Sequence, residues 1–149
     1  MTVIVSEEID VKEYLPHREP FLFVDKVVEI DEKRIEAIYN VTGKEFFFEG
    51  HFPGNPVMPG SLLFETIAQT GALLILVNRK MKAQHDQQIF PMKATEIIFK
   101  DVVRPGNTLH ITVESVRKRS KHVMFSGQII VKGEVKATAK FLGGIWRLR

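Results

Sequence analysis

The sequence predicts an α+β fold in which a curved antiparallel β-sheet wraps around one long central helix. The first observation is an almost wholly apolar segment at residues 61–79, which is too long for a strand and is normally buried on all sides as a helix. The second is that segments in the second half alternate apolar and polar side chains, as strands with one solvated face do. These apolar faces need a common cover. Because only one long helix is available, we expect the sheet to curve around it.

The first half of the chain is expected to contribute a short helix, two strands and a loop. Residues 6–15 have the pattern of a helix that Pro16 ends. Residues 21–30 and 34–41 are predicted strands, separated by a polar turn. In residues 50–60, six of the eleven positions are Gly or Pro, which is typical of a loop.

Three further strands are predicted in the second half. Residues 108–116, 122–131 and 135–141 each place apolar side chains at every second position. No internal repeat, low-complexity tract or linker interrupts the chain, so its 149 residues are predicted to form one domain, residues 1–149.

The composition is that of an ordinary globular protein, with 44% apolar and 26% charged residues. The longest apolar run, residues 72–77, is far shorter than the roughly 20 residues that cross a bilayer. The first residues lack the basic region of a secretory signal. We therefore expect no membrane span and a cytoplasmic location. The net charge of +3 permits an acidic partner but does not require nucleic acid.

The absence of cysteine excludes several chemistries. A disulfide framework, a thiolate nucleophile and a cysteine-based metal site all require that residue. The five histidines are scattered, and none lies at a metal-ligand spacing from another. We therefore expect no metal site.

His51 stands alone in the loop GHFPGNPVMPG, residues 50–60. A lone loop histidine is more often incidental than catalytic, but here Gly and Pro restrict the backbone on both sides, which can hold an imidazole in one place. Gly60 follows where the loop meets the start of the predicted helix. Its N–H is therefore a candidate donor to an oxyanion.

Glu65 is the single carboxylate in the apolar segment. It does not fit a capping box, because the position three residues after Ser61 is Phe64. Burial of an unpaired carboxylate is costly, so the pKa of Glu65 should be raised, and a neutral carboxyl group in such a pocket is a poised general acid. Gln69 lies one helical turn further on and is placed to orient it. Structural burial without function is the competing interpretation.

Three ordered stretches resemble one known family, the 3-hydroxyacyl-[acyl-carrier-protein] dehydratases of type II fatty-acid synthesis (FabZ-like). Residues 50–72, GHFPGNPVMPGSLLFETIAQTGA, are similar to the active-site segment of these enzymes. Residues 15–27, LPHREPFLFVDKV, and 102–109, VVRPGNTL, resemble two further signatures. The likeness runs from about Tyr14 to Phe141. It implies the hot-dog fold of that family, a sheet wrapped around a helix.

The resemblance implies a role for each residue of the candidate site. His51 corresponds to the base that removes the C2 proton, and Glu65 to the acid that protonates the leaving C3 hydroxyl. Gly60 corresponds to the donor that polarises the thioester carbonyl, and the Val57 carbonyl to the group that orients His51. The implied product is a trans-2-enoyl thioester, formed without a metal or any other cofactor.

The resemblance also implies partners. The substrate would arrive on acyl carrier protein, and subunits would pair as a homodimer or a trimer of dimers, with His51 of one chain meeting Glu65 of the other. The run RKRSKH, residues 117–122, is by default a solvated hairpin turn; nucleic-acid binding is disfavoured, because no motif or aromatic interleaving accompanies it. Candidate docking residues for an acidic carrier are Lys93, Lys100, Arg104, Arg117, Lys118, Arg119 and Lys121.

Two alternatives remain open at this stage. A hot-dog thioesterase would hydrolyse the acyl thioester, although the HFPG sequence of the loop argues against it. A catalytically silent carrier-binding subunit would not need His51, Gly60 and Glu65 together. Glu19, Asp101 and Val102 depart from the family pattern, so a dehydratase of a polyketide or other specialised pathway is a variant of the main prediction.

Overall fold

The computed structural model describes residues 4–5, 9–83 and 87–148. Its elements, in chain order, are β1 (Ile4–Val5), α1 (Val11–Tyr14), β2 (Lys26–Ile30), β3 (Arg34–Asn40), α2 (Gly60–Asn78), β4 (Gln87–Phe99), β5 (Thr108–Lys118), β6 (His122–Val131) and β7 (Glu134–Arg147).

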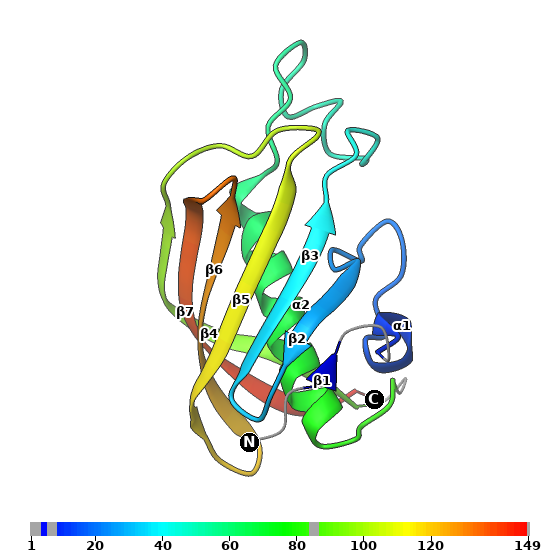
Figure 1. Cartoon of the computed structure of the whole chain (residues 1–149), viewed down its shortest axis with the longest axis vertical. Helices are drawn as coiled ribbons and strands as arrows, with labels where there is room; N and C mark the ends of the chain where they lie inside the picture. Colours follow the sequence, from blue (N-terminus) through cyan, green and yellow to red (C-terminus); the bar gives the residue numbers. More distant parts are fainter. Residues whose placement is uncertain (1–3, 6–8, 84–86, 149) are drawn as a thin grey trace.

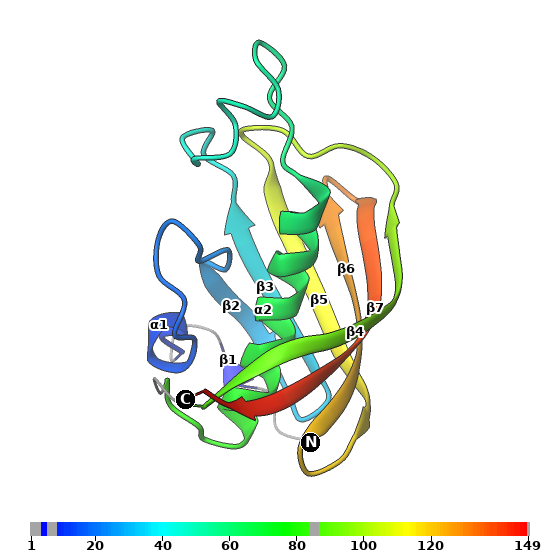
Figure 2. The ribbon, with the colours of Figure 1, turned by 180° about the vertical axis from the view of Figure 1, so that it is seen from behind.

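All the strands belong to one antiparallel sheet with the order β1-β2-β3-β5-β6-β7-β4. The sheet is strongly curved, and α2 runs along its concave face (Figures 1 and 2). This is the hot-dog fold, so the predicted architecture is confirmed. The sequence places α2 there because an apolar helix and the apolar faces of the strands bury each other.

Close contact between α2 and the sheet fixes the helix in position. From Thr66 to Val77 every residue of α2 is buried. Gly127 on β6 is needed for this approach, because a Cβ atom there would lie 2.6 Å from the Ile67 side chain. The buried strand residues that face the core include Ile35, Ala37, Leu109, Ile111, Val113, Phe125, Ile129, Ala139 and Phe141.

By length and mean hydropathy, α2 passes the test for a helix that can span a membrane, although its longest uninterrupted apolar run is short. In the structure 72% of that apolar window is buried inside the protein. Since the sheet already covers its apolar surface, α2 is the core helix of the domain.

Two predicted elements are shorter in the structure, and two strands, β1 and β4, are absent from the prediction. Residues 6–8 of the predicted first helix lie outside the described residues, and the described helix is the single turn α1, whose first amides are capped by Asp10. Of predicted strand 21–30, only the second half forms β2. Strand β4 was missed because its sequence shows no alternation of apolar and polar side chains. In the structure, both the apolar and the polar side chains of its Pro91–Phe99 part are exposed.

Strand β4 is one edge of the sheet and is paired only with β7. It presents a cluster of exposed apolar side chains, namely Met92, Ile97, Ile98 and Phe99. A long edge strand with an apolar surface is a template for pairing with another chain.

Candidate active site

The candidate site lies at the end of the sheet where α2 begins. The loop that carries His51 extends beyond the strands at the top of the view in Figure 1, and it leads directly into the first turn of α2. The helix holds Glu65 and Gln69 at positions one turn apart. The short distance along the chain between loop and helix brings His51, Gly60 and Glu65 to the same part of the molecule.

His51 is held by the backbone of its own loop. Its Nδ1 lies 2.7 Å from the Val57 carbonyl oxygen, and the Val57 N–H donates back to the His51 carbonyl at 2.8 Å. A carbonyl oxygen only accepts, so in the neutral imidazole Nδ1 carries the proton and Nε2 keeps the lone pair. The Phe52 ring stacks on the imidazole with the ring centroids 4.1 Å apart. This arrangement presents Nε2 as a base in a fixed orientation.

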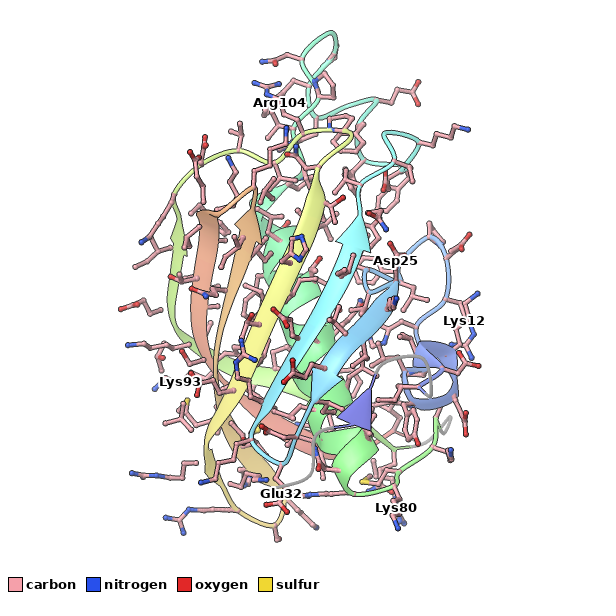
Figure 3. All side chains as sticks on the ribbon, viewed as in Figure 1. Lys12, Asp25, Glu32, Lys80, Lys93 and Arg104 are labelled. Atoms are coloured by element: carbon pink, nitrogen blue, oxygen red, sulfur yellow. The ribbon has the colours of Figure 1, made fainter. Side chains whose placement is uncertain are left out.

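The loop is anchored to the segment that precedes β5. The Arg104 guanidinium donates to Asn55 Oδ1 at 2.8 Å and to the Pro56 carbonyl at 3.3 Å. The Met58 N–H donates to the Val103 carbonyl at 2.8 Å. Figure 3 shows Arg104 at this end of the molecule. Arg104, predicted as a docking residue, therefore holds the loop that carries His51.

Glu65 is half-buried, with 24% of its side chain exposed. Burial raises the pKa of its carboxyl group, and the hydrogen bond from Gln69 partly opposes this rise. The donor is Gln69 Nε2, which lies 2.9 Å from Glu65 Oε2. The expected contact between the two side chains is present, and the carboxyl group is in an environment that favours its protonated form.

The orientation of the Gln69 amide is set by the segment that leads into β2. The Phe23 N–H donates to Gln69 Oε1 at 2.9 Å, while Gln69 Nε2 donates to the Phe21 carbonyl at 3.0 Å. Because Gln69 Oε1 accepts from the Phe23 N–H, Gln69 Nε2 is the atom that faces Glu65. These same bonds join Phe21 and Phe23 to the helix in place of β3, whereas the Asp25 N–H still donates to the Ile38 carbonyl of β3 at 2.8 Å.

His17 is a site residue that sequence reasoning missed. Its Nε2 lies 3.7 Å from Glu65 Oε2, and its side chain is 26% exposed. Burial, with a smaller contribution from the neighbouring Arg18 charge, lowers the pKa of His17. No spacing rule connects a residue before β2 with one in α2. The only available signal was that His17 lies inside the family-like stretch LPHREPF.

Gly60 is the first residue of α2, and the N-cap residue Pro59 makes no side-chain capping bond. Among the described residues, no acceptor is bonded to the Gly60 N–H. A Cβ atom on Gly60 would lie 2.9 Å from the Phe99 ring on β4. The backbone therefore offers an open donor at a helix N-terminus, and a side chain there would require Phe99 to move.

His51 and Glu65 do not meet within one chain. Both residues are described, and no hydrogen bond or ion pair joins their side chains. In the described part of the chain no group of three or more His, Asp or Glu residues is arranged to hold a metal ion.

The seven candidate docking residues are all exposed, but they lie in different places. The hairpin formed by β5 and β6, which carries Arg117, Lys118, Arg119 and Lys121, lies at the end opposite the His51 loop (Figure 1). Lys93 lies on the β4 side of the sheet (Figure 3). Lys100 and Arg104 flank the segment before β5, near the loop. In that segment the Asp101 carboxylate pairs with the Lys136 ammonium group at 2.7 Å. The negative charge of Asp101 offsets part of the positive charge of this region.

Comparison with known proteins identifies the family. The model of the FabA-like domain matches residues 15–140. The chain belongs to the FabA-like family. Among its relatives in that family, a 3-hydroxyacyl-[acyl-carrier-protein] dehydratase FabZ of Rickettsia bellii is 44% identical over 95% of this chain and 94% of its own length. The FabZ of Rickettsia massiliae is 41% identical over 93% of this chain and 94% of its own length.

Solved structures show the same fold for this FabA-like chain. The dehydratase heterocomplex ApeI:P of Xenorhabdus doucetiae superposes with a TM-score of 0.76 at 17% identity, over 95% of this chain and 92% of the other. The protein smu.793 of Streptococcus mutans, bound to acetyl CoA, superposes with a TM-score of 0.63 at 13% identity, over 91% and 98% of the two chains.

Proposed function

We propose that this FabA-like protein dehydrates 3-hydroxyacyl-[acyl-carrier-protein] to trans-2-enoyl-[acyl-carrier-protein] in fatty-acid synthesis. The observation that carries the proposal is the state of the two side chains. The Val57 carbonyl leaves His51 Nε2 free as a base, while burial favours the protonated form of Glu65. Loss of water requires a base for the C2 proton and an acid for the leaving hydroxyl, and these two side chains are the candidates. The relatives named FabZ, at 41–44% identity, support the same reaction.

In the proposed reaction, His51, Glu65 and Gly60 each have one role. His51 Nε2 accepts the C2 proton, and the electron pair of the C–H bond moves into the C2–C3 double bond. The C3–O bond breaks, its electron pair stays on oxygen, and the proton of Glu65 converts the departing hydroxide into water. The Gly60 N–H donates to the thioester oxygen, on which enolate charge develops. Glu65 ends as a carboxylate and His51 as an imidazolium, so one proton must return from base to acid before the next turnover.

The complete site is proposed to form between two subunits, because the dyad is not joined within one chain. The apolar edge strand β4 supports this assembly, since it offers both backbone hydrogen-bonding groups and apolar area to a second copy. Phe99, which touches Gly60, lies at the end of that edge. Pairing along β4 would therefore also place the oxyanion donor beside the interface.

Acyl carrier protein is the proposed substrate carrier, and a cytoplasmic location is proposed with it. Of the candidate docking residues, Arg104 contacts the His51 loop directly, which favours that end as the docking surface over the distant hairpin. Screening by salt should weaken docking between oppositely charged surfaces. Activity on carrier-bound substrate should therefore fall with salt more steeply than activity on a small thioester.

One assay tests the reaction. The protein is incubated with 3-hydroxyacyl and enoyl thioesters, while the absorbance of the conjugated enoyl group and the release of free thiol are followed together. A dehydratase changes the absorbance without releasing thiol. Thiol release would identify a thioesterase instead, and no change in either signal would identify a silent carrier-binding subunit.

The variants His51→Ala and Glu65→Gln test the assignment of roles. Each should lower kcat by about 10²–10⁴-fold, the usual contribution of a general base or acid, while circular dichroism shows an intact fold. The exposed His110 on β5, away from the site, provides the control substitution His110→Ala. Near-parental turnover in either dyad variant would show that the assigned role is wrong.

A further inference from the structure

Glu65 has two neighbours that approach the same oxygen. Gln69 Nε2 donates to Oε2 at 2.9 Å, and His17 Nε2 lies 3.7 Å from that same atom. The second separation is too short for a water molecule between the two atoms, and it lies about 0.5 Å beyond the long end of the N–H···O range. The two side chains are therefore neighbours whose hydrogen bond would form only after a shift of one toward the other. Oε1 makes no hydrogen bond within the described residues.

The segment that carries His17 is rigidly held. The Arg18 guanidinium donates to the carbonyls of Lys12, Leu15 and His17 at 2.7–2.9 Å. On the C-terminal side of His17, the backbone of Phe21 and Phe23 is bound by the Gln69 amide. The imidazole is therefore placed against Glu65 by bonds on both sides along the chain, and the same Gln69 amide orients the segment and the acid.

The surroundings of His17 select one neutral tautomer. Nδ1 is buried and has no hydrogen-bond partner among the described residues. A proton on Nδ1 would leave a buried N–H donor without an acceptor, whereas a proton on Nε2 points at Glu65 Oε2. The tautomer with the proton on Nε2 instead places that N–H beside Oε2, the oxygen that already accepts from Gln69 Nε2.

In its neutral form, a carboxyl group that accepts two N–H donors on one oxygen preferentially carries its proton on the other oxygen. We propose that His17 is a positioning residue, whose Nε2–H acts with Gln69 to make Oε2 the accepting oxygen of Glu65 and to leave the transferable proton on Oε1. This inference rests on the proposed dehydratase function. When Oε1 gives up its proton to the departing hydroxyl, the same two N–H groups stabilise the carboxylate that forms.

The charged and titratable groups that face this pair are few. Arg18 lies in the His17 segment and disfavours a charged imidazole. From α2 the facing group is the neutral amide of Gln69. In the proposed dimer the partner subunit's His51 is a further titratable group beside Glu65. Removal of the Nε2–H donor should raise the pKa of Glu65, because a hydrogen bond to the charged form is lost.

The test compares two substitutions of His17. His17→Phe keeps a ring of similar shape but removes the donor, and His17→Gln keeps an N–H near the position of Nε2 without titrating. We expect His17→Phe to lower kcat roughly 10- to 100-fold with little change in KM, which is the loss expected for a hydrogen bond to a charged group. His17→Gln should stay closer to the parent. The basic limb of the pH–rate profile, where Glu65 ionises, should move to higher pH in His17→Phe.

Independent measurements separate the possible results. Nitrogen NMR of the His17 imidazole should show the proton on Nε2 in the free protein, and His110→Phe, on the exposed face of β5, is the matched ring control. The inference is overturned if Nδ1 carries the proton, if His17→Phe retains the parental kcat and pH profile, or if folded His17→Gln is impaired as severely as His17→Phe. Parental activity of Glu65→Gln would instead refute the proposed function itself.

Discussion

At the residue scale, Glu65 combines a stability cost with a proposed catalytic use. Glu65 belongs to α2, most of whose residues are buried. Partial burial of the Glu65 carboxyl group raises its pKa. A group whose pKa is raised in the folded state contributes stability that is fully present below its ordinary pKa. That stability is lost as pH rises through the folded-state pKa. Ionisation of Glu65 therefore destabilises the fold above that value.

The variant Glu65→Gln should reveal this cost. Gln has nearly the same shape and stays neutral, so the variant should match the parent at about pH 4, where Glu65 is largely protonated. At pH 8 it should melt higher by about 2–4 °C, the shift that 1 kcal/mol produces in a domain of this size. Thermal unfolding at the two pH values measures the difference. A change in Tm that is equal at both pH values would contradict the linkage to ionisation.

At the element scale, the His51 loop depends on a contact with a distant segment. Gly and Pro restrict its backbone, but its attachment to the sheet comes from Arg104 and the Val103 carbonyl, which lie before β5. The helix N-terminus that follows contributes an open backbone donor at Gly60. The proposed base and the proposed oxyanion donor are thus held by two elements whose relative placement Arg104 helps to set.

Substitution of Arg104 distinguishes loop anchoring from carrier docking. Arg104→Ala removes the bonds to Asn55 and Pro56, and misplacement of the base by about 1 Å can cost up to 10²-fold in rate. We expect kcat to fall about 10-fold or more on a small thioester and on carrier-bound substrate alike. Lys100→Ala removes a nearby exposed charge without a loop contact and serves as the control. Loss confined to KM for the carrier-bound substrate would assign Arg104 to docking alone.

At the scale of the whole molecule, the sheet is closed around α2 on its concave face but open along β4. The exposed apolar side chains of β4 have no cover in one chain. His51 and Glu65 also lack a direct contact there. A second subunit paired along β4 accounts for both features, since it would cover the strand and supply the missing half of each site.

A charge on the β4 edge should separate the subunits. Ile97 is 37% exposed in the single chain and lies on this strand, so Ile97→Lys would place an ammonium group in the proposed apolar interface. Sedimentation velocity should show a shift toward monomer, together with loss of turnover. Val116→Lys, at a position that is 65% exposed on β5, should leave both unchanged. A fully dimeric Ile97→Lys would exclude β4 as the interface.

Complementation tests the shared site directly. When His51→Ala and Glu65→Gln chains are co-expressed, a mixed dimer has one site with both residues and one site with neither. Random pairing should restore about a quarter of the wild-type sites, because about half of the dimers are mixed. Either variant alone should remain inactive. Mixed dimers that are confirmed by mass spectrometry but lack activity would show that the site lies within one chain.

Local patterns in the sequence determined the helix Gly60–Asn78, the strands β3, β5 and β6, and the contact between Glu65 and Gln69. These features depend on side-chain period and on spacing along one element, which the chain carries wherever it folds. The hydrogen bond of His51 to Val57 is equally local, since both lie in one short loop.

Only the tertiary structure decided which distant segments meet at the site. It brought His17 to Glu65, Arg104 to the His51 loop, and Phe99 to Gly60. It also made β4 an edge strand, although that strand lacks an alternating pattern. Contacts of this kind join residues far apart in sequence, and they exist only because burial of α2 within the curved sheet fixes where every connecting segment can run.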